Sequence, residues 1–150
     1  TPAPVDLHTL VSLSIDELRI AFPAANLLHQ CSGSGIAHID ADRVQQIIGN
    51  LVANSVAYGD LKQPIVITSS FEEHQTIVSV RNQGSIIPET LMATLFEPMV
   101  RGTNDRNARS VGLGLFIVRE IARAHGGTVT VRSNPEEGTI FEVFFPQIKH

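Results

Sequence analysis

The sequence predicts an α+β fold, a two-layer sandwich in which helices pack on one face of a mixed, mostly antiparallel sheet. Two observations carry this prediction. Amphipathic helical segments and segments with strand-like alternation follow one another in the order helix, strands, helix, strand pair, loop, helix, strand pair. Such an order favours a helical layer and a sheet packed around one core. The length of 150 residues fits a single domain, for which about 100–150 residues is usual.

Composition excludes several classes of protein. Hydrophobic residues make up 43% of the chain and charged residues 17%, which indicates a globular domain. The single cysteine, Cys31, excludes a disulfide framework, and we expect it to be a small, half-buried residue. A formal charge of −4 argues against nucleic acid as a partner. No apolar run reaches the roughly 18 residues of a membrane span, so we expect a cytoplasmic domain, whether the full-length protein is soluble or membrane-anchored.

The spacing of apolar residues predicts two helices in the first half of the chain. The first covers residues 7–22 and is ended by the proline that follows. Two short strands come next, around residues 26–30 and 35–39, with a Ser-Gly turn between them. The second helix has the strongest period, with Asp40 as its N-cap and Gly59 as its stop signal.

The second half of the chain holds more strands and a third long helix. Alternating apolar residues predict four strands, at residues 64–72, 75–82, 128–133 and 139–145. Between the two pairs, residues 83–112 contain only a short helical piece near 88–95, and a loop of this length is often functional. The third helix follows this loop, with Leu113 expected on its buried side, and Gly126-Gly127 stops it.

Familiar catalytic patterns are missing from the chain. It has no P-loop, no GxGxxG, no GxSxG and no metal-ligand spacing among its six histidines. A first polar feature remains on the second helix, where Asn50 and Asn54 lie one turn apart. Amide oxygens suit Mg²⁺, which keeps several waters and takes phosphate oxygens as further ligands. The alternative is that both amides only cap or bridge strands.

Two further features have a functional and an ordinary interpretation. Asn82-Gln83-Gly84 ends a strand, and a glycine there allows a planar ring to approach the backbone closely. The alternative is an ordinary turn. Gly112-Leu113-Gly114-Leu115 is expected just before a helix and after Arg101, Arg106 and Arg109. Free backbone N–H groups and guanidinium groups together bind phosphate, whereas the alternative is a flexible loop with a solvated basic face.

Together these motifs resemble the ATP-binding catalytic domain of bacterial sensor histidine kinases, in the gyrase, Hsp90, histidine kinase and MutL (GHKL, or Bergerat-fold) superfamily. The resemblance covers the chain from about residue 5 to 146. Five stretches carry it in the family's order: Asp42–Gly59, which contains NLVANSVAYG, as the N box, VSVRNQGSIIP (78–88) as the first glycine box, LFEP (95–98) as the F box, GLGLFIVREIARAHGG (112–127) as the second glycine box, and Gly138-Thr139-x-Phe141 as the closing strand.

The resemblance implies a role for each matching position. Asn54 would hold Mg²⁺, and Asn50 would assist the phosphates or the water around the metal, so these two are the expected catalytic positions. Asn82 would bind the adenine amino group, and a lid of about residues 99–111 would fold over the phosphates. The other residues expected to bind ATP are Tyr58, Gly84, Ile87, Phe96, Arg101, Arg109, Gly112, Leu113, Gly114, Leu115 and Thr139.

The chain also departs from the family's pattern. Asn82 stands where aspartate is usual, and a neutral amide bonds the adenine amino group less strongly, by about 1 kcal/mol. This weaker bond predicts weak ATP binding. An asparagine can also rotate its amide so that the NH₂ group faces the base, which predicts reduced selectivity for ATP over GTP. Ile86 replaces a glycine, Ala57 a basic residue, Met99 a phenylalanine and Ser110 a glycine. Asparagine-type variants resemble phytochrome-linked members of the family.

The activity that the resemblance implies is transfer of the γ-phosphoryl group of ATP to a histidine in two-component signalling. Asp16 stands where the phosphoacceptor histidine would be required, so we expect that histidine on a separate dimerisation domain, absent from this chain. Expected partners are ATP, that domain and a downstream response regulator, with the isolated domain a monomer and the full protein a homodimer. The alternatives are a nucleotide-binding pseudokinase that acts as a regulatory module, and a serine kinase of the anti-sigma-factor type.

Overall fold

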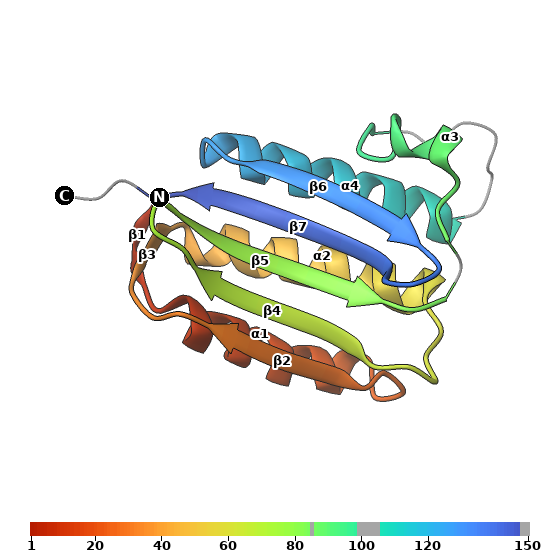
Figure 1. Cartoon of the computed structure of the whole chain (residues 1–150), viewed down its shortest axis with the longest axis horizontal. Helices are drawn as coiled ribbons and strands as arrows, with labels where there is room; N and C mark the ends of the chain where they lie inside the picture. The colour runs from red at the N-terminus through yellow and green to blue at the C-terminus, as the bar shows by residue number, and fades with distance from the viewer. Residues whose placement is uncertain (85, 99–105, 148–150) are drawn as a thin grey trace.

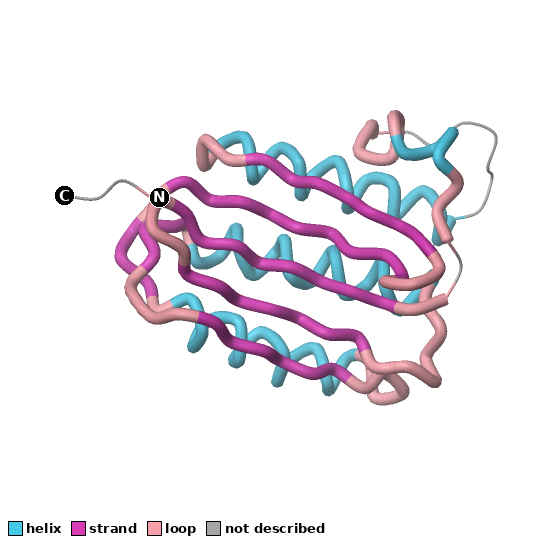
Figure 2. The backbone as a smooth tube through the Cα atoms, in the orientation of Figure 1, coloured by secondary structure: helices cyan, strands magenta, loops and turns pink. Residues whose placement is uncertain are grey.

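The computed structural model describes residues 1–84, 86–98 and 106–147, without the side chains of residues 106–112. Within these ranges the chain forms two layers, a five-stranded sheet and a layer of helices that covers one face of it (Figure 1). The three long helices are α1 (Leu7–Ala21), α2 (Ala41–Tyr58) and α4 (Arg106–Ala124). All three lie behind the sheet in the view of Figure 2. The predicted two-layer α+β architecture is confirmed.

The sheet is mixed and mostly antiparallel, as predicted. Its strand order is β2-β4-β5-β7-β6, in which β2 and β4 are parallel and every other neighbouring pair is antiparallel. Its strands are β2 (Leu27–Ser32), β4 (Ile65–Phe71), β5 (Gln75–Asn82), β6 (Thr128–Asn134) and β7 (Gly138–Pro146). The register of β5 with β7 places Asn82 opposite Thr139 at one end of the sheet.

Side-chain caps set the limits of the first two long helices. The Asp6 carboxylate accepts from the backbone N–H of Thr9 at the start of α1. The Asp40 carboxylate accepts from the backbone N–H of Arg43 at the start of α2. Such caps pair N–H groups that have no partner within the helix. Gly59 ends α2, so both limits predicted for this helix are confirmed.

The core lies between the helical layer and the sheet. Phe141 and Phe145 of β7 are fully buried there, beneath the apolar stripe of α2. The members of that stripe are Val44, Ile47, Ile48, Leu51 and Val52, all at 0% exposure. Because the stripe recurs with helical spacing, it holds one face of α2 against the sheet and leaves a neighbouring face for polar side chains.

The two short strands predicted between α1 and α2 belong to different sheets. The first, β2, is the edge strand beside β4, and the second, β3 (Ala37–Ile39), pairs with β1 (Ala3–Val5), which the sequence pattern did not reveal. Cys31 is exposed on edge strand β2 and not half-buried as predicted. Cys31 lines a surface pocket between α1 and β2, which leaves its side chain open to solvent.

The third long helix starts earlier than predicted. α4 begins at Arg106, so Gly112 and Gly114 lie inside the helix and not before it. Arginine and alanine in residues 106–111 are strong helix formers, and a helix accepts an interior glycine at about 1 kcal/mol each. Leu113, expected on the buried side, is 49% exposed. The short helix α3 (Glu89–Met92) confirms the helical piece predicted near residues 88–95.

None of the helices in the described part of the chain combines the length and the apolar character that crossing a membrane requires.

Candidate functional site

Four predicted site elements meet at one end of the sheet. The C-terminal ends of α2 and β5, the N-terminal half of α4 and the start of β7 converge at the right of Figure 1. Asn82, Asn54 and Thr139 are buried polar residues predicted for the site that lie at this end, with exposures of 4%, 6% and 4%. Buried polar groups are usually hydrogen-bonded, so the partners of each one indicate which groups remain available to a ligand.

Asn82 is fixed from two sides. Its Oδ1 accepts a hydrogen bond of 3.1 Å from the hydroxyl of Ser55 on α2. Its Nδ2 donates to the backbone carbonyl of Gln83 at 3.3 Å. An amide oxygen has two lone pairs, so the Asn82 oxygen retains one acceptor site after the Ser55 bond is made. Ser55 is fully buried, and sequence analysis did not single it out.

Glycines let the end of α2 approach the end of β5 closely. Gly59 and Gly84 form an isolated bridge, and the backbone N–H of Asp60 donates to the carbonyl of Gln83 at 2.7 Å. A Cβ on Gly59 would lie 2.5 Å from the Ser55 carbonyl oxygen and 3.0 Å from Asn82 Nδ2. A Cβ on Gly84 would lie 2.7 Å from the Asp60 nitrogen, and φ at Gly84 is +131°. Both positions therefore require glycine in this arrangement.

Asn54 differs from the other buried amides. It is 6% exposed, yet its side chain has no hydrogen-bond partner within residues 1–84, 86–98 and 113–147 or the backbone of residues 106–112. Asn50, one turn earlier, donates through Nδ2 to the Gly114 carbonyl of α4 at 3.2 Å. Asn50 thus joins two helices, α2 and α4, and not strands, whereas Asn54 keeps an amide available for a ligand.

Thr139 lies beside Asn82 and belongs to a second small network. Its hydroxyl is 2.7 Å from the Ser133 hydroxyl on β6, which also accepts from the backbone N–H of Ile87 at 2.8 Å. Ser133 therefore links β7 to the segment that follows β5, and sequence analysis missed it. A Cβ on Gly138 would lie 2.9 Å from Gln83 Oε1 and would overlap the Asn82 carbonyl oxygen, so this glycine belongs to the same junction.

The other predicted site residues divide into three groups. Phe96 packs edge-on against Phe141, with ring centroids 6.1 Å apart, and Ile87 packs partly buried on the core. Tyr58 and Leu113 are each 49% exposed at this end, whereas the Leu115 side chain is buried in the core. Arg101 and most of the predicted lid, residues 99–105, lie outside the described residues, as do the side chains of Arg109 and Ser110.

No motif in the sequence marks Ser55 or Ser133, although the chain carries a signal for one of them. Ser55 occupies the apolar stripe of α2, three positions after Val52 and four after Leu51, and is itself at 0% exposure. A polar residue within an apolar stripe needs a hydrogen-bond partner. Its partner, Asn82, lies 27 residues away in the sequence, and only the packing of α2 on β5 brings the two together.

Comparison with known proteins defines the class of this domain. The family described as histidine kinase-, DNA gyrase B- and HSP90-like ATPase matches residues 39–149, which include α2 and all the site elements described above. The chain belongs to this family. Within it, the chain corresponds to the ATP-binding catalytic domain of sensor histidine kinases, as its similarity to solved catalytic domains and curated kinases indicates.

Two curated relatives and one solved structure illustrate this similarity. The chain is 32% identical over 132 residues to a bacteriophytochrome of Pseudomonas aeruginosa, covering 87% of this chain and 18% of the relative. It is 31% identical over 112 residues to the signal transduction histidine-protein kinase AfsQ2 of Streptomyces coelicolor, covering 74% of this chain and 21% of the relative. The nucleotide-free catalytic domain of histidine kinase ThkA superimposes with a TM-score of 0.83 at 26% identity, covering 98% of this chain and 96% of that one.

Proposed function

We propose that this domain binds Mg-ATP at the junction of α2, β5, α4 and β7 and transfers the γ-phosphoryl group to a histidine on a separate phosphoacceptor domain. One observation carries the proposal most directly. Asn54 is a buried amide without a partner in the described part of the chain, on the helix face that carries Asn50. The Asn54 amide atoms are not among the fully enclosed, unpartnered polar atoms of the described residues, so they remain open to solvent or to a ligand.

The donor chemistry of Asn54 fits Mg²⁺. A neutral amide oxygen is a hard ligand, and Mg²⁺ is usually held by one or two protein oxygens together with substrate phosphates and waters. Bound Mg²⁺ would neutralise charge on the triphosphate. Asn54 would hold the ion, and Asn50, anchored to the Gly114 carbonyl, would fix the distance between α2 and the part of α4 that faces the phosphates.

The adenine end of the site follows from Asn82 and its surroundings. The free lone pair on Asn82 Oδ1 accepts from the adenine amino group, while Ser55 and the Gln83 carbonyl keep the amide in that orientation. Thr139, opposite Asn82 in the ladder, supplies a hydroxyl to the same edge of the base, through a water. Gly84 leaves the backbone clear for a flat ring.

The reaction breaks the bond between the γ-phosphorus and the bridging oxygen, which leaves with ADP, and forms a phosphorus–nitrogen bond to the acceptor imidazole. Such transfers depend mainly on positioning and on neutralising phosphate charge. The residues of this site position the nucleotide, whereas the acceptor nitrogen comes from the other domain. A response regulator would then receive the phosphoryl group.

The proposal is tested by mixing this domain with γ-labelled ATP, Mg²⁺ and a separately produced phosphoacceptor domain. We expect label on the acceptor histidine, and its loss with Asn54→Ala. Asn26→Ala is the matched control, because Asn26 is an exposed asparagine outside the site elements, and it should retain labelling. Saturable ATP binding with no label on the correct acceptor would indicate a pseudokinase, and label on a serine substrate instead would indicate the serine-kinase alternative.

A further inference from the structure

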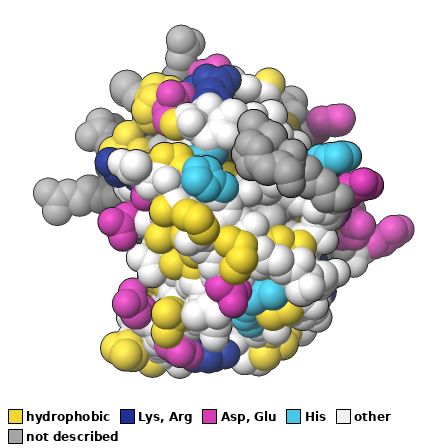
Figure 3. All heavy atoms as spheres, turned by 90° about the vertical axis from the view of Figure 1, so that its left-hand side faces the viewer, with side chains coloured by type: hydrophobic (Ala, Val, Ile, Leu, Met, Phe, Trp, Pro, Cys, Tyr) yellow, Lys and Arg dark blue, Asp and Glu magenta, His cyan; other side chains and the backbone are white. Residues whose placement is uncertain are grey.

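Three potential metal ligands gather at the end of the sheet opposite the nucleotide site. They are His8 of α1 and His29 and Cys31 of β2, and their ligand atoms all lie within 4.8 Å of one another. They line a shallow surface pocket of about 330 Å³ between α1 and β2. Figure 3 views the molecule from this end and shows histidine side chains on its surface. Neither the family's nucleotide chemistry nor the proposed reaction uses these residues.

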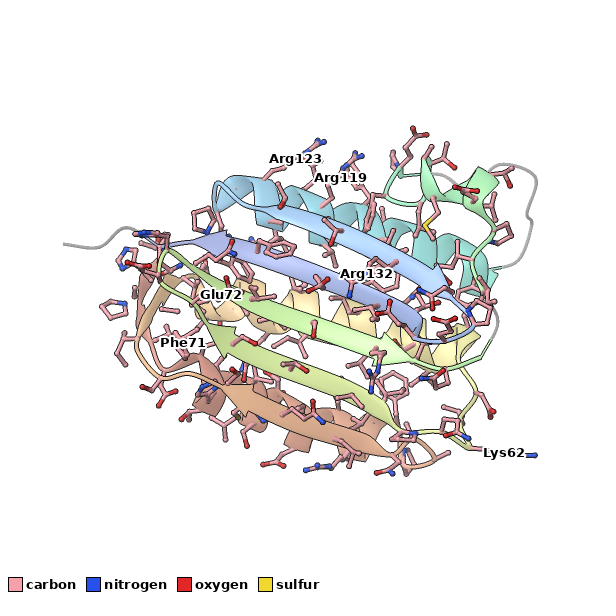
Figure 4. All side chains as sticks on the ribbon, viewed as in Figure 1. Lys62, Phe71, Glu72, Arg119, Arg123 and Arg132 are labelled. Carbon is pink, nitrogen blue, oxygen red and sulfur yellow. The ribbon has the colours of Figure 1, made fainter. Side chains whose placement is uncertain are left out.

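The fold explains how residues distant in the sequence meet here. His29 and Cys31 are two positions apart in a strand, so their side chains point to the same face. His8 lies in the first turn of α1, which packs on that face. Its ring stands edge-on to Phe71, with centroids 5.0 Å apart, and Phe71 is labelled at the end of β4 in Figure 4. Because the ligands come from two elements, no motif in the sequence reveals them.

Ser69 marks the point on which the three ligands converge. This residue pairs with Cys31 across the β2–β4 ladder and is fully buried. Its Oγ lies 2.6 Å from His8 Nδ1, 2.8 Å from His29 Nε2 and 3.9 Å from Cys31 Sγ. One hydroxyl has one proton, so it donates to only one of the two imidazoles at a time. The cluster therefore brings three potential metal-ligand atoms around one small volume.

A backbone contact fixes the tautomer of His8. Its Nε2 is 3.0 Å from the Gly33 carbonyl oxygen, and a carbonyl only accepts, so Nε2 carries the proton. His8 Nδ1 is then left with its lone pair directed at the Ser69 hydroxyl. Metal-binding histidines commonly use their second nitrogen in this way, because the outer hydrogen bond orients the ring.

The spacing of the His29 and Cys31 ligand atoms fits a zinc ion. Zn–N bonds of about 2.0–2.1 Å and a Zn–S bond of about 2.3 Å in a tetrahedron place nitrogen and sulfur about 3.5 Å apart. His29 Nε2 and Cys31 Sγ are 3.5 Å apart. Thiolate and imidazole form the donor set that Zn²⁺ favours.

We propose that His8 Nδ1, His29 Nε2 and Cys31 Sγ bind one Zn²⁺ ion, with water in the fourth position. Cys31 loses its thiol proton to solvent on binding. Ser69 becomes a positioning residue beside the two imidazoles. The open pocket leaves the fourth ligand position accessible, which resembles a site with three protein ligands more than a closed structural one. Because α1 and β2 each contribute ligands, the ion would join the first helix to the edge of the sheet.

Cobalt titration tests the proposal without reference to kinase activity. Co²⁺ occupies zinc sites, and a thiolate ligand gives it a charge-transfer band in the near ultraviolet. Cys31 is the only cysteine of the chain, so such a band reports on this residue alone. We expect one Co²⁺ per chain with this band, and its complete displacement by Zn²⁺.

Variants distinguish the three-ligand site from a lone thiol. Cys31→Ser should abolish the band, and His8→Ala or His29→Ala should each weaken Co²⁺ affinity at least tenfold. His74→Ala is the matched control, because His74 is an exposed histidine outside the cluster, and it should bind as the unmodified chain does. Circular dichroism without metal verifies that each variant is folded. The proposal is overturned by absence of the band at saturating Co²⁺, by a band unaffected by the two histidine variants, or by half an ion per chain, which would place the metal between two copies.

Discussion

The hydroxyl of Ser55 donates to the side-chain oxygen of Asn82 at 3.1 Å, joining the last turns of α2 to the end of β5. Both side chains are buried, and the Asn82 NH₂ group donates to the Gln83 carbonyl on the other side. The amide that we propose for adenine recognition is therefore held by the scaffold and not free to turn. This relationship gives Ser55 a positioning role that the sequence did not disclose.

Removing the Ser55 hydroxyl tests that role. We predict that Ser55→Ala weakens ATP binding several-fold and lowers the free energy of unfolding by about 1 kcal/mol, because a buried hydrogen bond is lost. Isothermal titration calorimetry measures the first effect and urea denaturation the second. Ser55→Thr, which keeps the hydroxyl, should retain more of the affinity than Ser55→Ala; equal affinities for the two variants would argue against the role.

The same hydrogen bonds bear on selectivity between nucleotides. The sequence predicts reduced preference for ATP over GTP because an asparagine can turn round. Turning Asn82 would place its oxygen against the Gln83 carbonyl oxygen, where its NH₂ group now donates at 3.3 Å. We therefore predict that ATP binds at least tenfold more tightly than GTP, a difference of about 1.4 kcal/mol. Calorimetric titration with each nucleotide measures the ratio, and equal affinities would show that the amide does turn.

Gly49 within α2 and Gly59 at its C-cap allow a matched comparison of how an added Cβ changes the free energy of unfolding. A Cβ on Gly59 would lie 2.5 Å from the Ser55 carbonyl oxygen, whereas a Cβ on Gly49 would meet nothing within 4 Å. We predict that Gly59→Ala destabilises the domain by about 1–3 kcal/mol, as overpacking does, and weakens ATP binding. Gly49→Ala should stabilise it by about 0.5–1 kcal/mol through helix propensity. Urea denaturation measures the free energy of unfolding of both variants. A Gly59→Ala variant as stable as the unmodified domain and with its full affinity for ATP would contradict this packing argument.

The metal-free domain should lose stability in mildly acidic solution through His29. Burial lowers the pKa of this imidazole below its ordinary value of 6.5, and His8 and then Arg19 add to the shift. The unfolded chain therefore binds more protons than the folded chain between the lowered pKa and 6.5, so stability falls as the pH falls through that window. Thermal unfolding with chelator at a series of pH values checks this. A His29→Gln variant should show a shallower pH dependence, and an unchanged slope would exclude His29 as its cause.

The sequence predicted the layers of this fold more fully than its close contacts. The apolar stripe of α2 and the alternation of β4 and β5 predict the secondary structure of these elements correctly, because local periodicity and burial agree. The partners of β2 and β3 depend on pairing across the chain, and β1 is too short to show a period. The predicted start of α4 is wrong because glycine is a common boundary signal, whereas Arg106 and the residues after it favour helix.

In the candidate site, too, motifs identify some residues, whereas only the packing of distant elements identifies others. Motif spacing identified Asn54, Asn82 and Gly84, which the structure brings to one end of the sheet. Ser55 and Ser133 act through partners in other elements, so no local pattern marks their function. The cluster of His8, His29 and Cys31 is the extreme case, since its ligands come from a helix and an edge strand and form no motif.

Asn54 is proposed to hold the magnesium of bound Mg-ATP, and a calorimetric comparison with and without Mg²⁺ measures this role. ATP is titrated into the unmodified domain and into Asn54→Ala, each with Mg²⁺ and with chelator. We predict that Mg²⁺ tightens ATP binding to the unmodified domain at least tenfold, or about 1.4 kcal/mol, and that it has little effect on Asn54→Ala. An equal gain from Mg²⁺ in both proteins would contradict the assignment.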